Sequence, residues 1–197
     1  MTNKLDELDL KIIHELRKDG RASLTELSER TGAPRQTVTN RLKQLVDGEL
    51  VPVRGGLSII KMGYKVSDIG LEIRGQSPRI EFEKYLRECP RVLDIFKIPG
   101  KANFHIRVWG EDDKTINSTI ESFGDIQNVD IIYTYYLGTP IHGDIIIDLE
   151  LNNRVEAPCG MVCDKCSRYH NMQCSGCPAT LYYRNPLLKE KDAITGS

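Results

Sequence analysis

The chain of 197 residues contains no long hydrophobic run, and its first residues, MTNKLDELDLK, are charged. A membrane span needs about 18 or more consecutive apolar residues, and a secretory signal peptide needs an apolar core near the N-terminus. The sequence therefore predicts no membrane association, and we expect a cytoplasmic location. Cysteine is scarce over most of the chain, because five of its six cysteines fall between residues 159 and 177. In the cytoplasm such a cluster indicates metal binding or redox chemistry rather than structural disulfides.

The chain also lacks a strong overall charge, but its net charge of -1 hides an uneven distribution. Residues 1–65 carry twelve Lys and Arg against nine Asp and Glu, whereas residues 66–157 carry ten against sixteen. A mildly basic N-terminal part joined to an acidic middle indicates that only the N-terminal part meets a polyanion.

Three short helices are predicted in the N-terminal part, because apolar side chains recur there at intervals of three and four residues. Ser23 and Glu26 form a capping-box pattern, Gly32 ends the second helix and Pro34 opens the third. The order and the tight turn at Gly32 predict a helix-turn-helix. The side chains expected to be buried in the first and third helices are Leu5, Leu8, Ile12, Leu16, Val38, Leu42, Leu45 and Val46.

The third helix presents a run of hydrogen-bond donors with no acidic residue before Asp47. A helix of this kind can donate to base edges and phosphates of double-stranded DNA, although any solvated helix also needs polar residues. After it, residues 49–60 read as a hairpin that turns at Gly55 and Gly56, which would make the domain winged. The predicted DNA-binding residues are Arg35, Gln36, Thr37, Thr39, Asn40, Arg41, Lys43 and, near the tip of the wing, Arg54.

Strand and helix patterns alternate over residues 66–151 in the order β-α-β-β-α-β. This order predicts a ferredoxin-like α+β domain with both helices on one face of an antiparallel sheet. In the first of these helices we expect Ile80, Phe82 and Leu86 to be buried. The segment IIYTYYLG, residues 131–138, has apolar or aromatic side chains on both faces of a strand, so we expect a partner subunit to cover the second face.

The segment LDELDLKIIHELRKDGRASLTELSERTGAPRQTVTNRLKQLVDGELV resembles the DNA-binding domain of the Lrp/AsnC (leucine-responsive) family of transcription regulators. The β-α-β-β-α-β order fits the effector domain that follows in that family. The resemblance implies a regulator rather than an enzyme, a homodimer or higher ring, and a small-molecule effector such as an amino acid. It places the effector site on a loop that reads Gly-Asp-Tyr-Asp in many members, and both acidic positions are replaced in the corresponding residues here, which are Gly100, Lys101, Ala102 and Asn103.

The cysteine cluster reads CGMVCDKCSRYHNMQCSGCP, with the spacing x3, x2, x7 and x2 and with His170 inside the longest gap. This segment has too few apolar residues to fold by itself. An iron-sulfur cluster, a structural Zn²⁺ ion and metal-free redox thiols all fit the pattern. Five thiols exceed the four that one site needs, which favours an iron-sulfur cluster or a thiol switch over a structural zinc site, and the iron-sulfur cluster is the leading prediction. Cys89, far away in sequence, is expected to be a free thiol. The predicted metal ligands are Cys159, Cys163, Cys166, Cys174 and Cys177.

These patterns predict four parts: a helix-turn-helix domain over residues 1–62, a ferredoxin-like domain over 63–152, a cysteine-rich metal-binding module over 153–180 and a tail over 181–197. The predicted function is sequence-specific DNA-binding regulation that responds to redox state or metal. One alternative is an architectural DNA-binding protein with a structural zinc site. The other is a tetrapyrrole decarboxylase of similar two-domain plan, which is disfavoured because the Gly63-Tyr64 pair has no His or Arg beside it.

Overall fold

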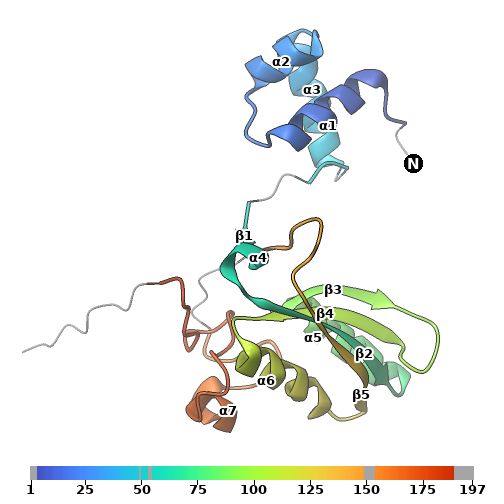
Figure 1. Cartoon of the computed structure of the whole chain (residues 1–197). Helices are drawn as coiled ribbons and strands as arrows, with labels where there is room; N and C mark the ends of the chain where they lie inside the picture. Colours follow the sequence, from blue (N-terminus) through green and yellow to red (C-terminus); the bar gives the residue numbers. More distant parts are fainter. Residues whose placement is uncertain (1–3, 49, 53–54, 149–153, 189–197) are drawn as a thin grey trace, which may run out of the picture. The chain divides into compact units, whose positions relative to one another are not determined.

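The computed structural model describes residues 4–48, 50–52, 55–148 and 154–188, and the chain forms two compact units, Met1–Gly55 and Gly56–Ser197 (Figure 1). Each unit has its own hydrophobic core. In the part of the chain that is described, no helix is long and apolar enough to cross a membrane.

The first unit consists of three helices, as predicted: α1 (Glu7–Lys18), α2 (Leu24–Thr31) and α3 (Arg35–Asp47). Asp6 and Ser23 cap α1 and α2 through capping boxes. The core contains Ile12, Leu27, Val38, Leu45 and Val51. Two predicted core residues are wrong, because Leu5 and Val46 are each 40% exposed; Leu5 precedes the cap of α1, and Val46 lies on the outer side of the last turn of α3.

The predicted wing hairpin over residues 49–60 is also wrong. The strand β1 (Leu57–Ser58) pairs with β6 (Ile146–Ile147), which lies far away in sequence. The short helix α4 (Ile59–Met62) follows β1 directly. Burial explains this choice, because Ile59 and Ile147 pack in one apolar cluster with Trp109, and a local turn at two glycines offers no such burial. Arg54 lies outside the described residues.

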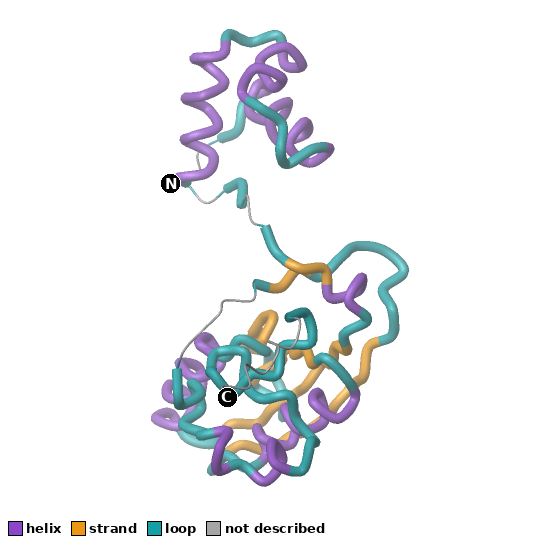
Figure 2. Tube along the Cα trace, turned by 90° about the vertical axis from the view of Figure 1, so that its left-hand side faces the viewer, coloured by secondary structure: helices purple, strands orange, loops and turns teal. Residues whose placement is uncertain are grey.

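The second unit is built on a four-stranded antiparallel sheet with the strand order β3-β4-β2-β5. In chain order its elements are β2 (Lys65–Ile73), α5 (Gln76–Glu88), β3 (Val92–Lys97), β4 (Phe104–Gly110), α6 (Asp113–Gly124) and β5 (Val129–Leu137). The predicted β-α-β-β-α-β order and the α+β class are therefore confirmed. The described part of the chain after residue 153 consists mainly of loops (teal in Figure 2), with the 3-10 helix η1 (Cys163–Lys165) and the short helix α7 (Ser167–His170) among them.

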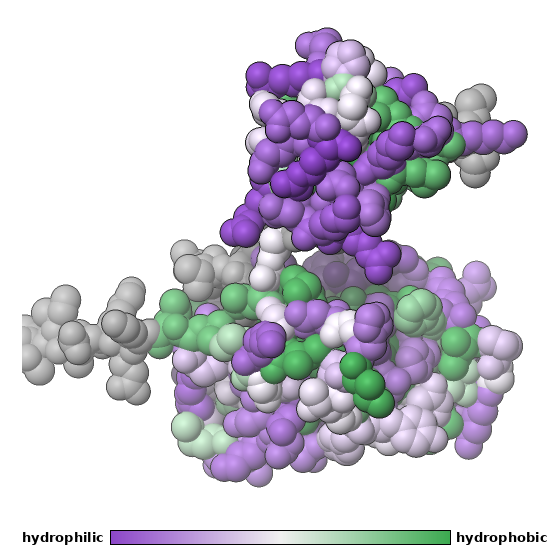
Figure 3. Space-filling model, turned by 45° about the horizontal axis from the view of Figure 1, so that its top comes forward, coloured by the Kyte–Doolittle hydropathy of each residue, from purple (hydrophilic) through white to green (hydrophobic). Residues whose placement is uncertain are grey.

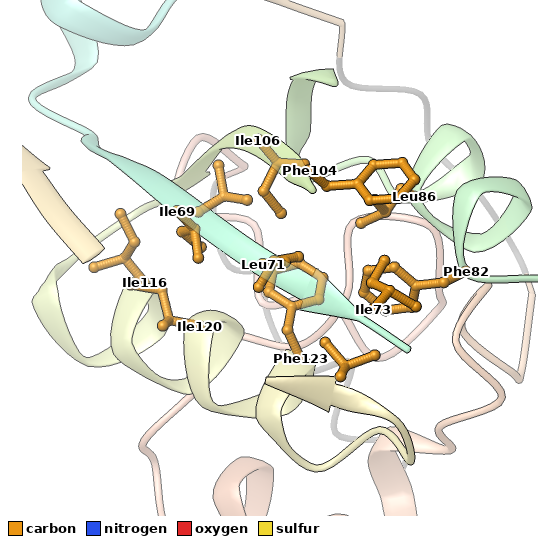
Figure 4. Packing of buried hydrophobic residues seen from close by; sticks show 12 residues of the cluster. Ile69, Leu71, Ile73, Phe82, Leu86, Phe104, Ile106, Ile116, Ile120 and Phe123 are labelled. Atoms are coloured by element: carbon orange, nitrogen blue, oxygen red, sulfur yellow. The ribbon is translucent and has the colours of Figure 1, made fainter. Parts of the chain in front are cut away.

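The core of the second unit lies between the sheet and the two helices α5 and α6 (Figure 4). In this view Phe82 of α5 lies beside Ile73 of β2, Leu86 of α5 beside Phe104 of β4, and Phe123 of α6 beside Leu71 of β2. Ile80, which was expected in this core, is 64% exposed instead. It precedes Phe82 by two positions, and two positions on a helix lie about 200° apart around the axis, so the two side chains cannot share one face.

The opposite face of the sheet carries two rows of cross-strand neighbours. One row is Phe96, His105, Gly70 and Tyr133, and the other is Asp94, Arg107, Asp68 and Tyr135. Tyr135 is 62% exposed, so the expected burial of both faces of β5 is absent within a single chain.

Candidate functional site

The turn between α2 and α3 positions α3 for contact with a ligand outside the unit. Gly32 has a φ of 71°, a left-handed conformation that favours glycine, and it ends α2. The hydroxyl of Ser28 donates to the carbonyl of Ala33 at 2.7 Å and closes the turn. Pro34 is the N-cap residue of α3. These local contacts orient α3 as the second helix of a helix-turn-helix.

The exposed face of α3 is made of donors. Hydrophilic residues cover most of the visible surface of the first unit (purple in Figure 3). On α3 the Gln36 amide donates to the Asn40 side chain at 3.1 Å, and the hydroxyl of half-buried Thr39 donates to the Arg35 carbonyl at 2.8 Å. The exposed polar side chains on this helix before Asp47 are Arg35, Gln36, Thr37, Asn40, Lys43 and Gln44. Gln44 was absent from the predicted set, although it shares this composition.

Arg41 differs from the other predicted DNA-binding residues. Its guanidinium lies 2.7 Å from the carboxylate of Asp6 and 3.3 Å from that of Asp9. Asp9 is buried and Asp6 caps α1. Arg41 therefore joins α3 to the first turn of α1, while its side chain stays 37% exposed. The sequence pattern could not separate the two uses, because both require a long basic side chain.

Replacement of Arg41 by Met is expected to lower the free energy of unfolding of the first unit by about 1–2 kcal/mol, because buried Asp9 would keep a charge without its partner. Thermal unfolding followed by circular dichroism measures this. Lys43→Met, on the exposed face, is the matched control and should leave the unfolding temperature unchanged. An equal effect of the two variants would contradict the structural role of Arg41.

The loop expected to bind an effector has its polar side chain committed elsewhere. Gly100 has a φ of 118°, and Ala102 is buried. The Asn103 amide accepts from the backbone N–H of Ile73 and donates to the carbonyl of the same residue, each at 3.0 Å. Asn103 thus ties the loop to the end of β2, and Lys101 is the only charged side chain of this four-residue stretch.

The five clustered cysteines lie on tight turns in the second unit, and none of them forms a disulfide. Cys163 is buried at the start of η1, with its sulfur 3.8 Å from the Thr180 hydroxyl. Cys166 precedes α7, and the Cys174 sulfur accepts from the backbone N–H of Gly176 at 3.4 Å. In the described residues, which include every cysteine, no three His, Cys, Asp or Glu side chains form a ready metal site.

Burial shapes the chemistry of these thiols. It raises the pKa of Cys159 and Cys174, and it raises the pKa of Cys177 to about 12. A reactive redox thiol needs a lowered pKa, because the thiolate is the nucleophile. The direction of these pKa shifts disfavours the thiolate form that a metal-free redox switch would use.

Cys89 is the residue that the sequence pattern missed. It ends α5, and burial raises the pKa of its thiol, with a further contribution from neighbouring Cys159. After burial, which is the largest cause, the negative charge that Cys89 or Cys159 would carry as a thiolate also raises the pKa of Cys177, so the three thiols lie within electrostatic reach of one another. Tyr85 lies beside the same thiols. Cys89 precedes Cys159 by 70 residues, so the sequence did not indicate that the two thiols are close in space.

The cysteine segment, which we define as residues 157–184, packs against α6. Arg168 pairs with Glu121 at 3.3 Å and with Asp125 at 2.7 Å. The Ser118 hydroxyl donates to the carbonyl of Gln173 at 2.6 Å. The segment follows α6 as orange-red loops around α7 in Figure 1. Polar contacts with the sheet domain thus help to hold the cysteine segment in place, because the segment has few apolar residues of its own.

A buried ion pair lies beneath the same segment. The guanidinium of Arg91 contacts the carboxylate of Glu111 at 2.9 and 3.2 Å, and each side chain is 5% exposed. Arg91 also donates to the carbonyl of Gly176 at 2.7 Å. Tyr183 donates its hydroxyl to Glu111 at 2.5 Å. Neither member of the ion pair stood out in the sequence.

Comparison with known proteins finds similarity that extends from the first unit into the second. The AsnC-type helix-turn-helix domain family matches residues 5–46. The chain is 30% identical over 121 residues to an uncharacterized HTH-type transcriptional regulator of Pyrococcus horikoshii, PH1055, and the match covers 60% of this chain and 76% of that relative. It is 29% identical over 118 residues to the HTH-type transcriptional regulator LrpC of Bacillus subtilis, covering 59% and 82% respectively.

A solved structure is similar over both units. It is the transcriptional regulator NMB0573 of Neisseria meningitidis in complex with L-Met, with a TM-score of 0.60 and 26% sequence identity. The match covers 97% of that protein but 74% of this chain. This chain therefore carries sequence that this neighbour lacks.

Proposed function

The chain belongs to the Lrp/AsnC family of DNA-binding transcription regulators, and from this premise we propose that its DNA binding responds to the state of the cysteine segment. Its relatives are regulators, so the expectation that it is not an enzyme is confirmed. The observation that carries the proposal is the attachment of a segment with five cysteines to the second unit through α6 and Arg91. A segment attached in this way can change the domain when its own fold changes.

The thiols support metal binding over a metal-free redox switch. The raised pKa values of Cys159, Cys174 and Cys177 disfavour reactivity of these three thiols without a metal, whereas a thiolate-binding metal ion displaces the protons itself. Because no three ligands converge among the described residues, metal binding would draw the loops together. We propose an iron-sulfur cluster held by four of Cys159, Cys163, Cys166, Cys174 and Cys177, with Zn²⁺ as the alternative.

Metal analysis of protein purified without oxygen tests the proposal. We expect iron and acid-labile sulfide, with a broad absorption band near about 400 nm. Stoichiometric zinc in a colourless protein would select the structural alternative. DNA affinity is then measured before and after removal of the metal, and an unchanged affinity would contradict the proposed response.

The control for this test is Cys89→Ser. Cys89 lies beside Cys159 and Cys177 but outside the closely spaced group. If four of the five clustered thiols are the ligands, this variant keeps its metal, whereas Cys174→Ser loses much of it. Loss of metal in both variants would make Cys89 a ligand.

We also propose self-association through the open face of the sheet, which carries exposed Tyr135 and Phe96. Aromatic side chains on an uncovered sheet face are typical of a subunit interface. A small-molecule effector is the second proposal, since a neighbour of similar fold is a complex with L-Met. Measurement of DNA affinity at increasing L-Met concentration tests this proposal, and the change is compared with the change caused by removal of the metal.

A further inference from the structure

Arg91 occupies the junction between the cysteine segment and the sheet domain. Its guanidinium donates to the carbonyl of Gly176, which lies between Cys174 and Cys177 in the sequence CSGC. When the sulfurs of these two cysteines rearrange around a metal or on oxidation, the carbonyl of Gly176 is therefore expected to shift. Arg91 is the buried group bonded to that carbonyl.

On its other side Arg91 contacts Trp109. The guanidinium carbon lies 5.1 Å from the centroid of the Trp109 ring. The backbone N–H of Trp109 donates to the carbonyl of Arg91 at 3.0 Å, and the indole N–H donates to the carbonyl of Pro90 at 2.9 Å. Trp109 is fully buried. A displaced guanidinium would therefore change the surroundings of this indole directly.

Trp109 in turn packs on the start of the second unit. Its ring stacks on Tyr64 with centroids 5.5 Å apart and planes 8° apart. Both belong to the apolar cluster that includes Ile59 and Leu57. Leu57 and Ile59 follow closely in sequence after Gly55, the last residue of the DNA-binding unit. The cluster thus fixes the segment from which the DNA-binding unit extends.

We propose that Arg91 transmits the state of the Cys174–Cys177 loop through Trp109 to residues 57–64, the segment that joins the two units. This inference rests on the proposed response of DNA binding to the cysteine segment. Arg91 is a positioning residue in this scheme, because it touches neither DNA nor any proposed ligand. Its planar guanidinium suits the role, since it holds Glu111 with two bonds, donates to Gly176 and stacks on an aromatic ring at the same time.

The experiment exploits the single tryptophan of the chain, Trp109. The state of the thiols in the full-length protein is changed in two ways: by adding Zn²⁺ alone to reduced protein, and by oxidation with diamide. In the second case two thiols form a disulfide, and diamide takes up their two hydrogens. Free thiols are counted after each treatment. Tryptophan emission and affinity for DNA are then measured on the same samples.

In the wild-type protein we expect a changed tryptophan emission and about a tenfold change in DNA affinity, a coupling of ordinary size. Arg91→Lys keeps a positive charge for Glu111 but cannot make all three contacts at once. In this variant the thiol count should still fall, whereas the emission change is lost and the DNA response drops to about twofold or less. The double variant R91M/E111Q removes both buried charges together and should also lose the emission change and most of the DNA response. It serves as the second test if Arg91→Lys fails to fold.

The matched control is Arg168→Met, because Arg168 also anchors the cysteine segment but pairs with Glu121 and Asp125 on α6. It should keep both responses. A full emission and DNA response in Arg91→Lys would overturn the inference, as would a silent wild-type tryptophan after a fall in thiol count. A responsive tryptophan with constant DNA affinity would overturn the proposed function and retain the path through Arg91. A thiol count that neither treatment lowers would overturn both.

Discussion

Replacement of Arg35 by Glu is expected to raise the Kd for specific DNA by about 30-fold or more, because a lost base or phosphate contact costs about 1–3 kcal/mol and the new carboxylate repels the phosphates. Arg35 is the first residue of α3 and is exposed. The N-terminal residues of a recognition helix are the ones that reach base edges. Fluorescence anisotropy with promoter DNA at a fixed salt concentration measures the change.

The control for Arg35→Glu is Arg87→Glu, which makes the same change of charge on α5 of the second unit, where the Arg87 side chain is 69% exposed. It should alter the Kd little. The slope of log Kd against log salt should also fall by about one in Arg35→Glu if the lost contact is to a phosphate. Unchanged binding by Arg35→Glu would mean that α3 does not face DNA.

The second large effect is expected from Gly176→Ala. Gly176 has a φ of 86°, which a residue with a Cβ rarely adopts, and an added Cβ would lie 2.7 Å from the backbone oxygen of Tyr182. Backbone atoms cannot move aside as the end of a flexible side chain can. Strain of this kind costs about 1–3 kcal/mol, so the Cys174–Cys177 loop should leave its place on Arg91.

If the cysteine segment binds metal as proposed, Gly176→Ala is expected to lose most of that metal while the sheet stays folded. Hydrogen exchange should rise in residues 173–184 and remain constant in β2 and β4, and metal content per chain is measured alongside. Gly138→Ala is the control, because no atom lies within 4 Å of an added Cβ there. Normal metal content and exchange in Gly176→Ala would contradict the positions of Gly176 and Tyr182.

The predictions that held depend on local chemistry. Ser23 with Glu26 and the break at Gly32 define α2 through contacts within a few residues. The alternation of patterns over residues 66–151 likewise reflects the period of each element, because one face of each is buried. The predicted burial of Ile80 and Val46 was wrong, although it also relied on local pattern. Both residues are apolar, but whether a helical side chain is buried depends on where the neighbouring element lies.

The sequence alone determined the helix-turn-helix, the order of elements in the second unit and the composition of the cysteine segment, because residue spacing encodes period, caps and turns. Only the tertiary structure decided that Arg41 pairs with Asp9, that β1 pairs with β6, and that Cys89 and Arg91 lie at the cysteine segment. The reason is physical. A buried ion pair or a shared apolar cluster gains its stability from desolvation and contact between residues far apart in the chain, and no local pattern records which partners will meet.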